Sequence, residues 1–251
     1  MDLKLKDKVA LVTGGARGLG KTICQLFAAE GAKVAICDLQ ESQALAEELS
    51  RTCGVQALAV KADITSEADV AAMFDRIEKT LGPVDALVNN AAIVFDAGPM
   101  TSITEKEWSR IFQVNVEGTF LCSRELIRRL LAAKRTGKIV SISSQAAFRG
   151  SQSGKLAYDA SKGAIVTFTI ALAREMAPHG INVNCVAPGL MRTEMLAAQI
   201  DANPERFNSR VPLHRMGKTE EIGSVAVFLC SEQAGYMTGA TVDVSGGLAM
   251  H

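Results

Sequence analysis

The chain contains 251 residues, of which 48% are hydrophobic and 22% are charged, and this composition excludes a disordered protein. Its 27 Lys and Arg are balanced by 27 Asp and Glu, so the formal net charge is zero. Nucleic-acid-binding proteins usually carry a basic excess, and we therefore expect no nucleic-acid partner.

The sequence also shows no recognisable targeting signal, membrane span or cysteine motif. The N-terminus is charged and lacks the apolar core of a signal peptide, and no stretch approaches the ~18 uncharged apolar residues of a membrane span. The six cysteines are scattered, include no Cys-x-x-Cys pair and lie mostly in apolar runs. We therefore expect a cytoplasmic protein without a membrane partner, a disulfide framework or a metal site.

Short β-branched runs alternate with longer helical periods along the chain. The runs predict strands over 9–13, 33–37, 57–61, 84–88, 138–143, 181–186 and 240–244. The periods predict helices that end near residue 30 and that cover 41–52, 66–81, 104–133, 157–178 and 219–231, with a polar, irregular segment over 190–217. Thr104 and Glu107 have the spacing of a capping box at the start of the longest helix.

Strands that alternate with helices form parallel sheets through right-handed crossovers. The strands are almost continuously apolar, which is typical of a sheet covered on both faces. We therefore predict an α/β fold: one domain over 1–251, with a doubly wound, seven-stranded parallel sheet.

A glycine-rich turn follows the first strand, in the segment Thr-Gly-Gly-Ala-Arg-Gly-Leu-Gly at 13–20. Glycines there allow a tight turn and let the backbone approach a pyrophosphate, which the free N–H groups of the next helix attract. The pattern predicts a Rossmann-like dinucleotide site. The residues of this turn that we expect to contact the dinucleotide are Gly14, Arg17, Gly18, Leu19 and Gly20.

An acidic residue, Asp38, ends the second strand and is followed by Leu39. A carboxylate there can accept hydrogen bonds from both ribose hydroxyls of an adenosine, although it could also be a solvated helix cap. A 2′-phosphate beside it would cost up to about 4 kcal/mol at an effective dielectric constant near 20. We therefore expect NAD rather than NADP, even though Arg17 could reach a 2′-phosphate.

Two further strand ends carry candidate contacts to the dinucleotide. Asp63, which precedes Ile64, could hydrogen-bond the adenine amino group or, with about equal weight, cap the following helix. Asn-Asn-Ala-Ala at 89–92 ends the fourth strand with small residues that would leave room beside the sheet. Ligands of open α/β sheets bind at the carboxyl ends of the strands. We therefore add Asp63, Ile64, Asn90, Ala91 and Ala92 to the predicted dinucleotide site.

Tyr158 and Lys162 lie four residues apart and so share one face of a predicted helix. A tyrosine with its ordinary pKa near 10 is a poor base, but an ammonium group nearby would lower that pKa. The pair could therefore move a proton to or from an alcohol oxygen. An isolated Tyr-x-x-x-Lys is more often a surface pair; here the helix lies between two strands on the predicted cofactor side.

Three more polar residues stand out near this pair. Ser143 and Ser144 end the fifth strand, where a hydroxyl could hydrogen-bond the reacting oxygen or simply cap the strand. Asn115 lies in the middle of the longest predicted helix, although asparagine is a poor helix former, which indicates a local bend.

Together these motifs resemble the short-chain dehydrogenase/reductase family over essentially the whole chain. The matching elements are the glycine motif at 13–20, Asn-Asn-Ala at 89–91, Asn115, Ser144, Tyr158-x-x-x-Lys162, and Pro188-Gly189 with Thr193. The resemblance implies that Tyr158 is the catalytic acid/base, that Lys162 binds the nicotinamide ribose and lowers the tyrosine pKa, and that Ser144 polarises the substrate oxygen. It further implies that Asn115 holds a water in a proton relay. Residues implied to line the nicotinamide half are Asn90, Pro188, Gly189 and Thr193.

The sequence departs from the family pattern at three places. Ala92 stands where the family usually has glycine, Ser144 precedes Tyr158 by 14 residues where 13 is commoner, and Ser245 is inserted after the last strand. The longer serine–tyrosine spacing leaves Ser143 and Gln145 as minor rivals for the role of the serine.

From these residues we predict an oxidoreductase that transfers hydride between NAD and a secondary alcohol or its ketone. We expect Ser144, Gln145 and Tyr158 to contact the small-molecule substrate, the segment 190–217 to shape its pocket, and a homotetramer to form through the helices at 104–133 and 157–178. The main alternative is an NADPH-dependent 3-oxoacyl-[acyl-carrier-protein] reductase, docked through a basic patch of Arg128, Arg129, Lys134 and Arg135. A more remote alternative is a dinucleotide-binding module without turnover.

Overall fold

The computed structural model describes residues 2–95, 98–151, 154–191, 203 and 205–250. Within them, seven parallel strands form one sheet in the order β3-β2-β1-β4-β5-β6-β7. The strands are β1 (Val9–Thr13), β2 (Lys33–Asp38), β3 (Ala57–Lys61), β4 (Ala86–Asn89), β5 (Gly137–Ile142), β6 (Ile181–Pro188) and β7 (Thr241–Val244). The predicted α/β, doubly wound parallel sheet is thereby confirmed.

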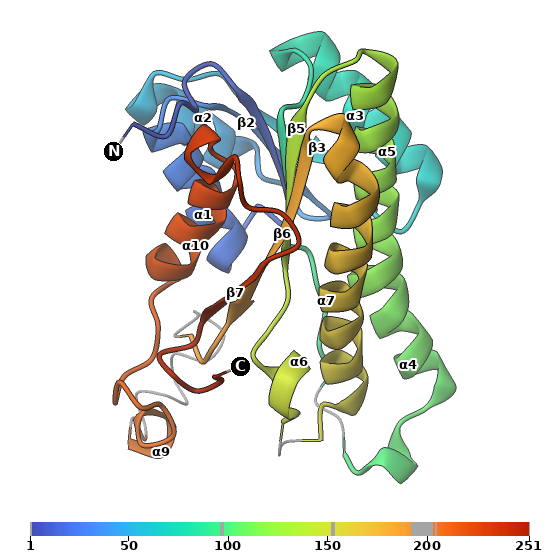
Figure 1. Ribbon diagram of the computed structural model, residues 1–251, viewed down its shortest axis with the longest axis vertical. Coiled ribbons are helices and arrows are strands. Elements are labelled where there is room, and N and C mark those ends of the chain that lie inside the picture. The colour runs from blue at the N-terminus through green and yellow to red at the C-terminus, as the bar shows by residue number, and fades with distance from the viewer. Residues whose placement is uncertain (1, 96–97, 152–153, 192–202, 204, 251) are drawn as a thin grey trace.

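The helices cover both faces of this sheet (Figure 1). They are α1 (Gly18–Ala29), α2 (Gln43–Cys53), α3 (Glu67–Leu81), α4 (Glu105–Phe112), α5 (Gly118–Ala132), α6 (Ala146–Arg149), α7 (Leu156–Met176), α9 (Glu205–Asn208) and α10 (Thr219–Leu229). The buried faces of α1, α2 and α10 pack on one side of the sheet, and those of α3, α5 and α7 pack on the other. No helix in the described residues is long and apolar enough to cross a bilayer.

The alternation of side chains along each strand explains these two layers. In β1, Ala10 and Val12 point into the cluster under α1 and α10, whereas Val9 and Leu11 point into the cluster under α3 and α5. All four are at most 2% exposed. A strand buried on both faces needs apolar residues at every position, and for that reason the strands read as continuous apolar runs.

The longest predicted helix is interrupted. The capping box of Thr104 and Glu107 starts α4 as expected, but residues Gln113–Glu117 form a π-helical turn between α4 and α5. Asn115 lies within this turn, at the bend its presence predicted.

Other differences are smaller and occur in connecting segments. β4 begins two residues later than predicted, because Asp85 instead accepts a hydrogen bond from the backbone N–H of Val9 and pairs with Arg135. The short helices α6 and α9 were not predicted; each has only four residues, too few to show a helical period.

The order of the strands determines where a ligand can bind. From β1 the chain moves outward to β2 and β3, and it then returns to the other side of β1 as β4. The two crossovers that leave β1 and β4 therefore run on opposite faces, and the carboxyl ends of these strands open into a crevice. The glycine turn, Asp38 and Asn90 all lie at this edge of the sheet.

Candidate active site

The glycine turn packs tightly against the end of β4. A Cβ atom at Gly20 would lie 2.0 Å from the carbonyl oxygen of Gly14, and one at Gly14 would lie 2.8 Å from Cα of Ala91. Gly14 and Gly18 also have positive φ values of 63° and 54°, which side chains disfavour. At Gly18, by contrast, a Cβ would meet nothing within 4 Å. The turn is thus packed closely against its neighbours at Gly14 and Gly20 but is open at Gly18, as a phosphate-binding turn requires.

The N-terminus of α1 offers that cradle its donors. In the described structure its N-cap residue, Arg17, makes no side-chain capping bond, and the first turn carries no acidic residue. The first N–H groups of a helix without such partners attract an anion. This uncapped end fits the pyrophosphate of a dinucleotide, and the buried side chain of Leu19 anchors the turn beneath it.

The side chain of Asp38 is bonded to the glycine turn and is not simply a solvated helix cap. Its Oδ2 accepts a hydrogen bond from the backbone N–H of Ala16 (3.0 Å), and its Oδ1 accepts one from Gln40 (3.0 Å). The carboxylate therefore bridges the end of β2 and the turn. Leu39, 55% exposed, follows it at the rim of the crevice.

Asp63 has a local structural role. Its Oδ1 accepts hydrogen bonds from the backbone N–H and from Oγ1 of Thr65, whereas Ser66 is the residue that caps α3. Burial raises the pKa of Asp63, but the two Thr65 bonds and the charge of Arg110 outweigh it and lower the pKa. The predicted capping role is therefore wrong in detail, because Asp63 closes the turn before the helix. Its neighbour Ile64 is buried.

Asn90 supports the glycine turn from the end of β4. Its Nδ2 donates to the carbonyl oxygens of Thr13 (2.9 Å) and Gly14 (3.0 Å). Oγ1 of Thr13 in turn accepts from the backbone N–H groups of Asn90 and Ala91, both at 3.1 Å. Thr13 was not predicted as a site residue; the available signal was a polar side chain at the end of an otherwise apolar strand. Ala92, beyond this bridge, is exposed.

The structure separates the two serines that end β5. Ser143 is 2% exposed, and its Oγ donates to the carbonyl oxygen of Lys162 at 2.7 Å. Ser144 is less buried, accepts from the backbone N–H of Ala146, and forms a hydrogen bond with the hydroxyl of Tyr158. Ser143 therefore joins the strand to α7, while Ser144 is the serine in contact with Tyr158. Gln145 follows, with its Oε1 buried and without a partner among the described residues.

Lys162 lies beneath Tyr158 and is 3% exposed. Its Nζ donates to the carbonyl oxygen of Ile142 (2.7 Å) and lies 5.6 Å from the centroid of the Tyr158 ring. Burial lowers the pKa of Lys162 to about 8. The ammonium group is thus close to Tyr158, and its bond to Ile142 holds it there.

The pKa of the Tyr158 hydroxyl moves in the direction opposite to the one predicted. Burial raises this pKa above its ordinary value of 10, the hydrogen bond with Ser144 lowers it, and the charge of Asp159 raises it further. The prediction considered only the neighbouring lysine and not the desolvation of the phenol.

Asn115 connects the π-helical turn to this pair. Its Oδ1 accepts from the backbone N–H of Ile93 (2.8 Å), and its Nδ2 donates to the carbonyl oxygen of Ile93 and to Oγ of Ser161, both at 3.0 Å. Ser161 Oγ donates to the carbonyl oxygen of Tyr158. Asn115 therefore supports the first turn of α7 through Ser161, which was not predicted. The water relay implied by the family stays a prediction.

The remaining predicted residues lie at the end of β6 or beyond it. Pro188 accepts from the backbone N–H of Gln145, and Gly189 packs so closely on Ser245 that a Cβ would lie 2.6 Å from Cα of that serine. Thr193 and most of the segment 190–202 lie outside the described residues. Among the described residues, no three His, Cys, Asp or Glu side chains gather where they could hold a metal ion.

Comparison with known proteins agrees with this geometry. A family model described as enoyl-(acyl carrier protein) reductase matches residues 14–249. The chain is 37% identical to 3-oxoacyl-[acyl-carrier-protein] reductase FabG of Aquifex aeolicus (99% of this chain, 100% of that one) and 37% identical to galactitol 2-dehydrogenase of Agrobacterium fabrum (98% of each). A solved structure of a proposed 2-deoxy-D-gluconate 3-dehydrogenase from Agrobacterium tumefaciens, with bound NADP, superposes with a TM-score of 0.89 at 32% identity (98% of each chain). With its glycine turn after β1 and with Ser144, Tyr158 and Lys162 together beside the end of β5, this chain belongs to the short-chain dehydrogenase/reductase family of oxidoreductases.

Proposed function

We propose that this chain is an NAD-dependent dehydrogenase that interconverts a secondary alcohol and its ketone. The observation that carries the proposal is the contact between the Ser144 and Tyr158 hydroxyls at the carboxyl end of β5, with the buried Lys162 beneath them. Two hydroxyls so arranged can both approach one substrate oxygen. The supporting relatives include a galactitol 2-dehydrogenase by name.

Each residue has a defined part in this chemistry. When bound, the nicotinamide cofactor supplies or accepts the hydride. In the oxidation direction the Tyr158 oxygen takes the proton of the substrate hydroxyl, and in reduction it returns that proton. Ser144 Oγ holds the substrate oxygen by a hydrogen bond. While it is protonated, Lys162 favours the phenolate of Tyr158, although burial raises the pKa of Tyr158 overall.

The first experiment measures initial rates with a panel of secondary alcohols, including polyols, in parallel with NAD and NADP. We expect formation of reduced cofactor with NAD on at least one class of alcohol. Nucleotide binding without turnover on the whole panel, and without reduction of the matching ketones, would favour the binding-module alternative.

Asp38 is expected to make NAD the preferred cofactor. Its carboxylate, held by Ala16 and Gln40, would lie close to a 2′-phosphate and repel it. We expect kcat/KM to favour NAD over NADP by roughly 100-fold, which corresponds to about 3 kcal/mol and is within the Coulomb cost of two like charges at a few ångströms. Asp38→Asn keeps the hydrogen-bond acceptor but removes the charge, and should reduce the preference to within about tenfold.

Glu41→Gln is the matched control for this measurement, because Glu41 is an exposed acid close to Asp38 in the chain and pairs with Lys61. Its cofactor preference should equal that of the wild type. The relative with bound NADP and the exposed Arg17 support the opposite preference. A wild-type enzyme that favours NADP would show that Arg17 outweighs Asp38.

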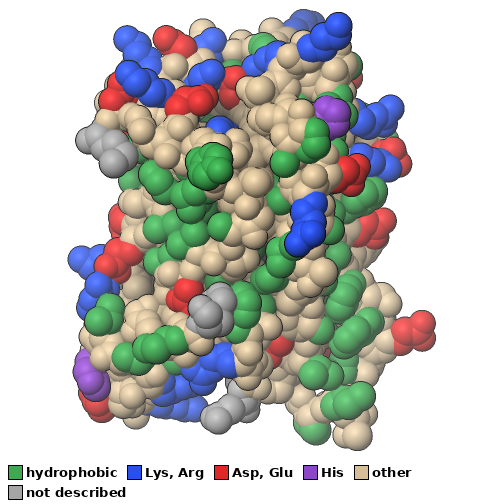
Figure 2. Space-filling view, in the orientation of Figure 1, with side chains coloured by type: hydrophobic (Ala, Val, Ile, Leu, Met, Phe, Trp, Pro, Cys, Tyr) green, Lys and Arg blue, Asp and Glu red, His purple; other side chains and the backbone are tan. Residues whose placement is uncertain are grey.

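We further propose that the chain assembles as a homotetramer through α4, α5 and α7. These helices expose large apolar side chains, among them Trp108, Phe120, Leu156 and Ile170, each 39–44% exposed. Figure 2 shows hydrophobic side chains along this side of the molecule. Light scattering should give a mass near four times the 26.6 kDa chain. Phe120→Glu should reduce that mass, because it places a charge in the apolar contact, whereas Thr80→Glu on the exposed side of α3 should leave it unchanged.

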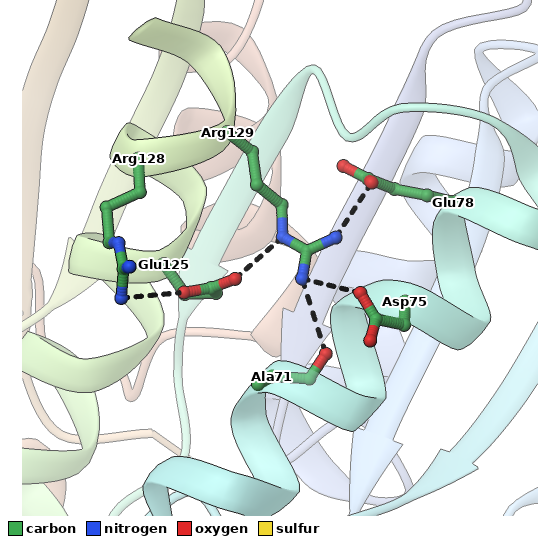
Figure 3. Close-up of polar contacts among 6 residues, drawn as sticks. All are labelled: Ala71, Asp75, Glu78, Glu125, Arg128 and Arg129. Atoms are coloured by element: carbon green, nitrogen blue, oxygen red, sulfur yellow. Dashed lines mark hydrogen bonds and ion pairs between the residues drawn. The ribbon is translucent and has the colours of Figure 1, made fainter. Parts of the chain in front are cut away.

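The second candidate function is reduction of a 3-oxoacyl group on an acyl carrier, which the similarity to the FabG of Aquifex aeolicus favours. The docking patch predicted for it is largely neutralised. Arg129 binds Glu125 (2.8 Å), Glu78 (2.8 Å) and Asp75 (2.7 Å), as Figure 3 shows. Arg135 pairs with Asp85, and Arg128 lies 3.9 Å from Glu125. Four carboxylates thus offset these arginines, which disfavours docking of an acidic partner there. Turnover of 3-oxoacyl thioesters with NADPH, and none of alcohols with NAD, would favour this second candidate.

A further inference from the structure

Asp159, the residue after the proposed acid/base, bonds to the segment that precedes α7. Its Oδ2 accepts two hydrogen bonds from Ser151, one from the backbone N–H and one from Oγ, both at 2.7 Å. Its Oδ1 is buried and has no partner among the described residues. The carboxylate lies in the first turn of α7, where the helix dipole favours a negative charge.

This contact shortens the connection between the Ser144 and Tyr158 hydroxyls. Ser144 and Tyr158 stand at opposite ends of one segment, and their hydrogen bond requires that the segment return to its starting point. The Ser151–Asp159 bonds tie the middle of the segment to α7. The part left to close, from Ser144 to Ser151, includes the short helix α6, and a shorter loop costs less entropy to close. Asp159 therefore supports the contact between Ser144 and Tyr158 through Ser151.

The charge of Asp159 acts on Tyr158 as well. Among the described residues, other charged groups near Tyr158 are Lys162, whose Nζ lies 5.6 Å from the ring centroid, and Lys155 and Glu107, which line a small pocket with Tyr158. Glu107 Oε2 is bound to the N–H and Oγ1 of Thr104. Burial raises the pKa of Tyr158 most, and the charge of Asp159 raises it further.

We propose that Asp159 is a positioning residue that anchors Ser151 to the first turn of α7 and thereby holds Ser144 against Tyr158. Asp159 follows Tyr158 directly in the chain, and its negative charge also opposes ionisation of the Tyr158 hydroxyl. The proposal rests on the proposed function in one respect, namely that Tyr158 is the acid/base. It gives this chain a means of setting the pH range in which that hydroxyl can accept a proton.

Two variants separate the anchor from the charge. Asp159→Asn keeps an oxygen that can accept both Ser151 bonds but removes the negative charge; Ser151→Ala keeps the charge but removes one of the two bonds. In Asp159→Asn, loss of the charge favours the phenolate, so the limb of the kcat–pH profile for alcohol oxidation should move to lower pH by roughly 0.5 unit. In Ser151→Ala the limb should stay in place while kcat falls by about two- to fivefold.

A second measurement does not depend on turnover. The chain has only two tyrosines, and Tyr236 is fully exposed, so Tyr236→Phe leaves Tyr158 as the single tyrosine. The ¹³Cζ chemical shift of labelled tyrosine in this background reports ionisation of Tyr158 directly, with circular dichroism as the check on folding. The midpoint should be lower in Tyr236→Phe/Asp159→Asn than in Tyr236→Phe alone.

These experiments distinguish failure of the Asp159 proposal from failure of the proposed function. If no alcohol is turned over, the proposed function fails, but the ¹³Cζ titration still decides the effect of Asp159. An unchanged midpoint in the Asn variant, or a Ser151→Ala variant whose profile moves like that of Asp159→Asn, would overturn the proposal. Failure of both Asp159→Asn and Asp159→Ser to fold would overturn it too, because a neutral hydrogen-bonding side chain is expected to preserve the anchor.

Discussion

Replacing Tyr158 by phenylalanine should reduce kcat for the alcohol substrate by roughly 10³-fold while the Kd for NAD changes less than about threefold. The variant removes only the hydroxyl that is bonded to Ser144, and proton transfer by a positioned side chain contributes about 10²- to 10⁴-fold to rate. The ring itself remains to pack against Lys162. Steady-state rates and nucleotide titration by fluorescence measure the two quantities.

The chain provides its own control for this variant. Tyr236 is the other tyrosine, it is fully exposed, and Tyr236→Phe should leave both kcat and Kd at wild-type values. Near wild-type turnover in Tyr158→Phe would assign the acid/base role to another group, for which Ser144 is the nearest candidate. A loss of NAD binding equal to the loss of turnover would instead show that the hydroxyl acts in binding.

Lys162→Met should abolish activity and yet stabilise the folded chain at pH 7 by about 2 kcal/mol. Burial lowers the pKa of Lys162 from 10.5 to about 8, so at pH 7 the folded chain holds a charge that its environment disfavours. This shift corresponds to about 3 kcal/mol. Methionine removes this destabilisation, but it also removes the hydrogen bond to the Ile142 carbonyl, whose loss destabilises the folded chain by about 1 kcal/mol.

The sign of this effect depends on pH. Below pH 8 the lysine is protonated in both the folded and the unfolded chain, and the penalty is fully present. Between pH 8 and 10.5 the folded chain has lost the proton and the unfolded chain keeps it, so wild-type stability rises with pH. The advantage of Lys162→Met should therefore shrink above pH 8 and reverse near pH 10, where the neutral lysine still bonds to Ile142.

Urea unfolding at a fixed protein concentration, at pH 7, 8, 9 and 10, measures this dependence. Lys79→Met on α3 is the control for the replacement of a lysine by methionine, because the side chain of Lys79 is exposed. A constant difference between wild type and Lys162→Met over the whole range would contradict the buried, weakly basic lysine. A buried charge in the site would be one case of stability given up for function.

The secondary structure could be predicted closely because the local patterns were strong. The central strands, such as β1 and β2, have both faces covered, so their sequences are apolar runs that need no tertiary information to recognise. The capping box formed by Thr104 and Glu107 predicted the start of α4 from only four residues of sequence. The π-helical turn was visible in the sequence only as an asparagine in an unsuitable place, because the sequence does not show that Asn115 bonds to the backbone of Ile93, 22 residues earlier.

Only part of the candidate site could be predicted from the sequence. Residues that are proposed to face the dinucleotide, such as Gly18 and Asp38, could be predicted from its shape and charge. The residues that support them could not be predicted in this way. Thr13, Ser161 and Asp159 act through hydrogen bonds with particular backbone atoms, and no sequence spacing indicates such bonds. The same holds for the basic patch, since the sequence shows Arg129 beside Arg128 but not the carboxylates that α3 brings to it.

The sequence by itself determined the class of sheet, the position of the glycine turn and the identity of the tyrosine–lysine pair, because each depends on contacts within a few residues or on the chemistry of a known ligand. The tertiary structure alone decided which serine meets Tyr158, how deeply Lys162 is buried and in which direction the two pKa values move. Desolvation and long-range hydrogen bonds cause these properties. Both arise only when β5, α4 and α7 are brought together.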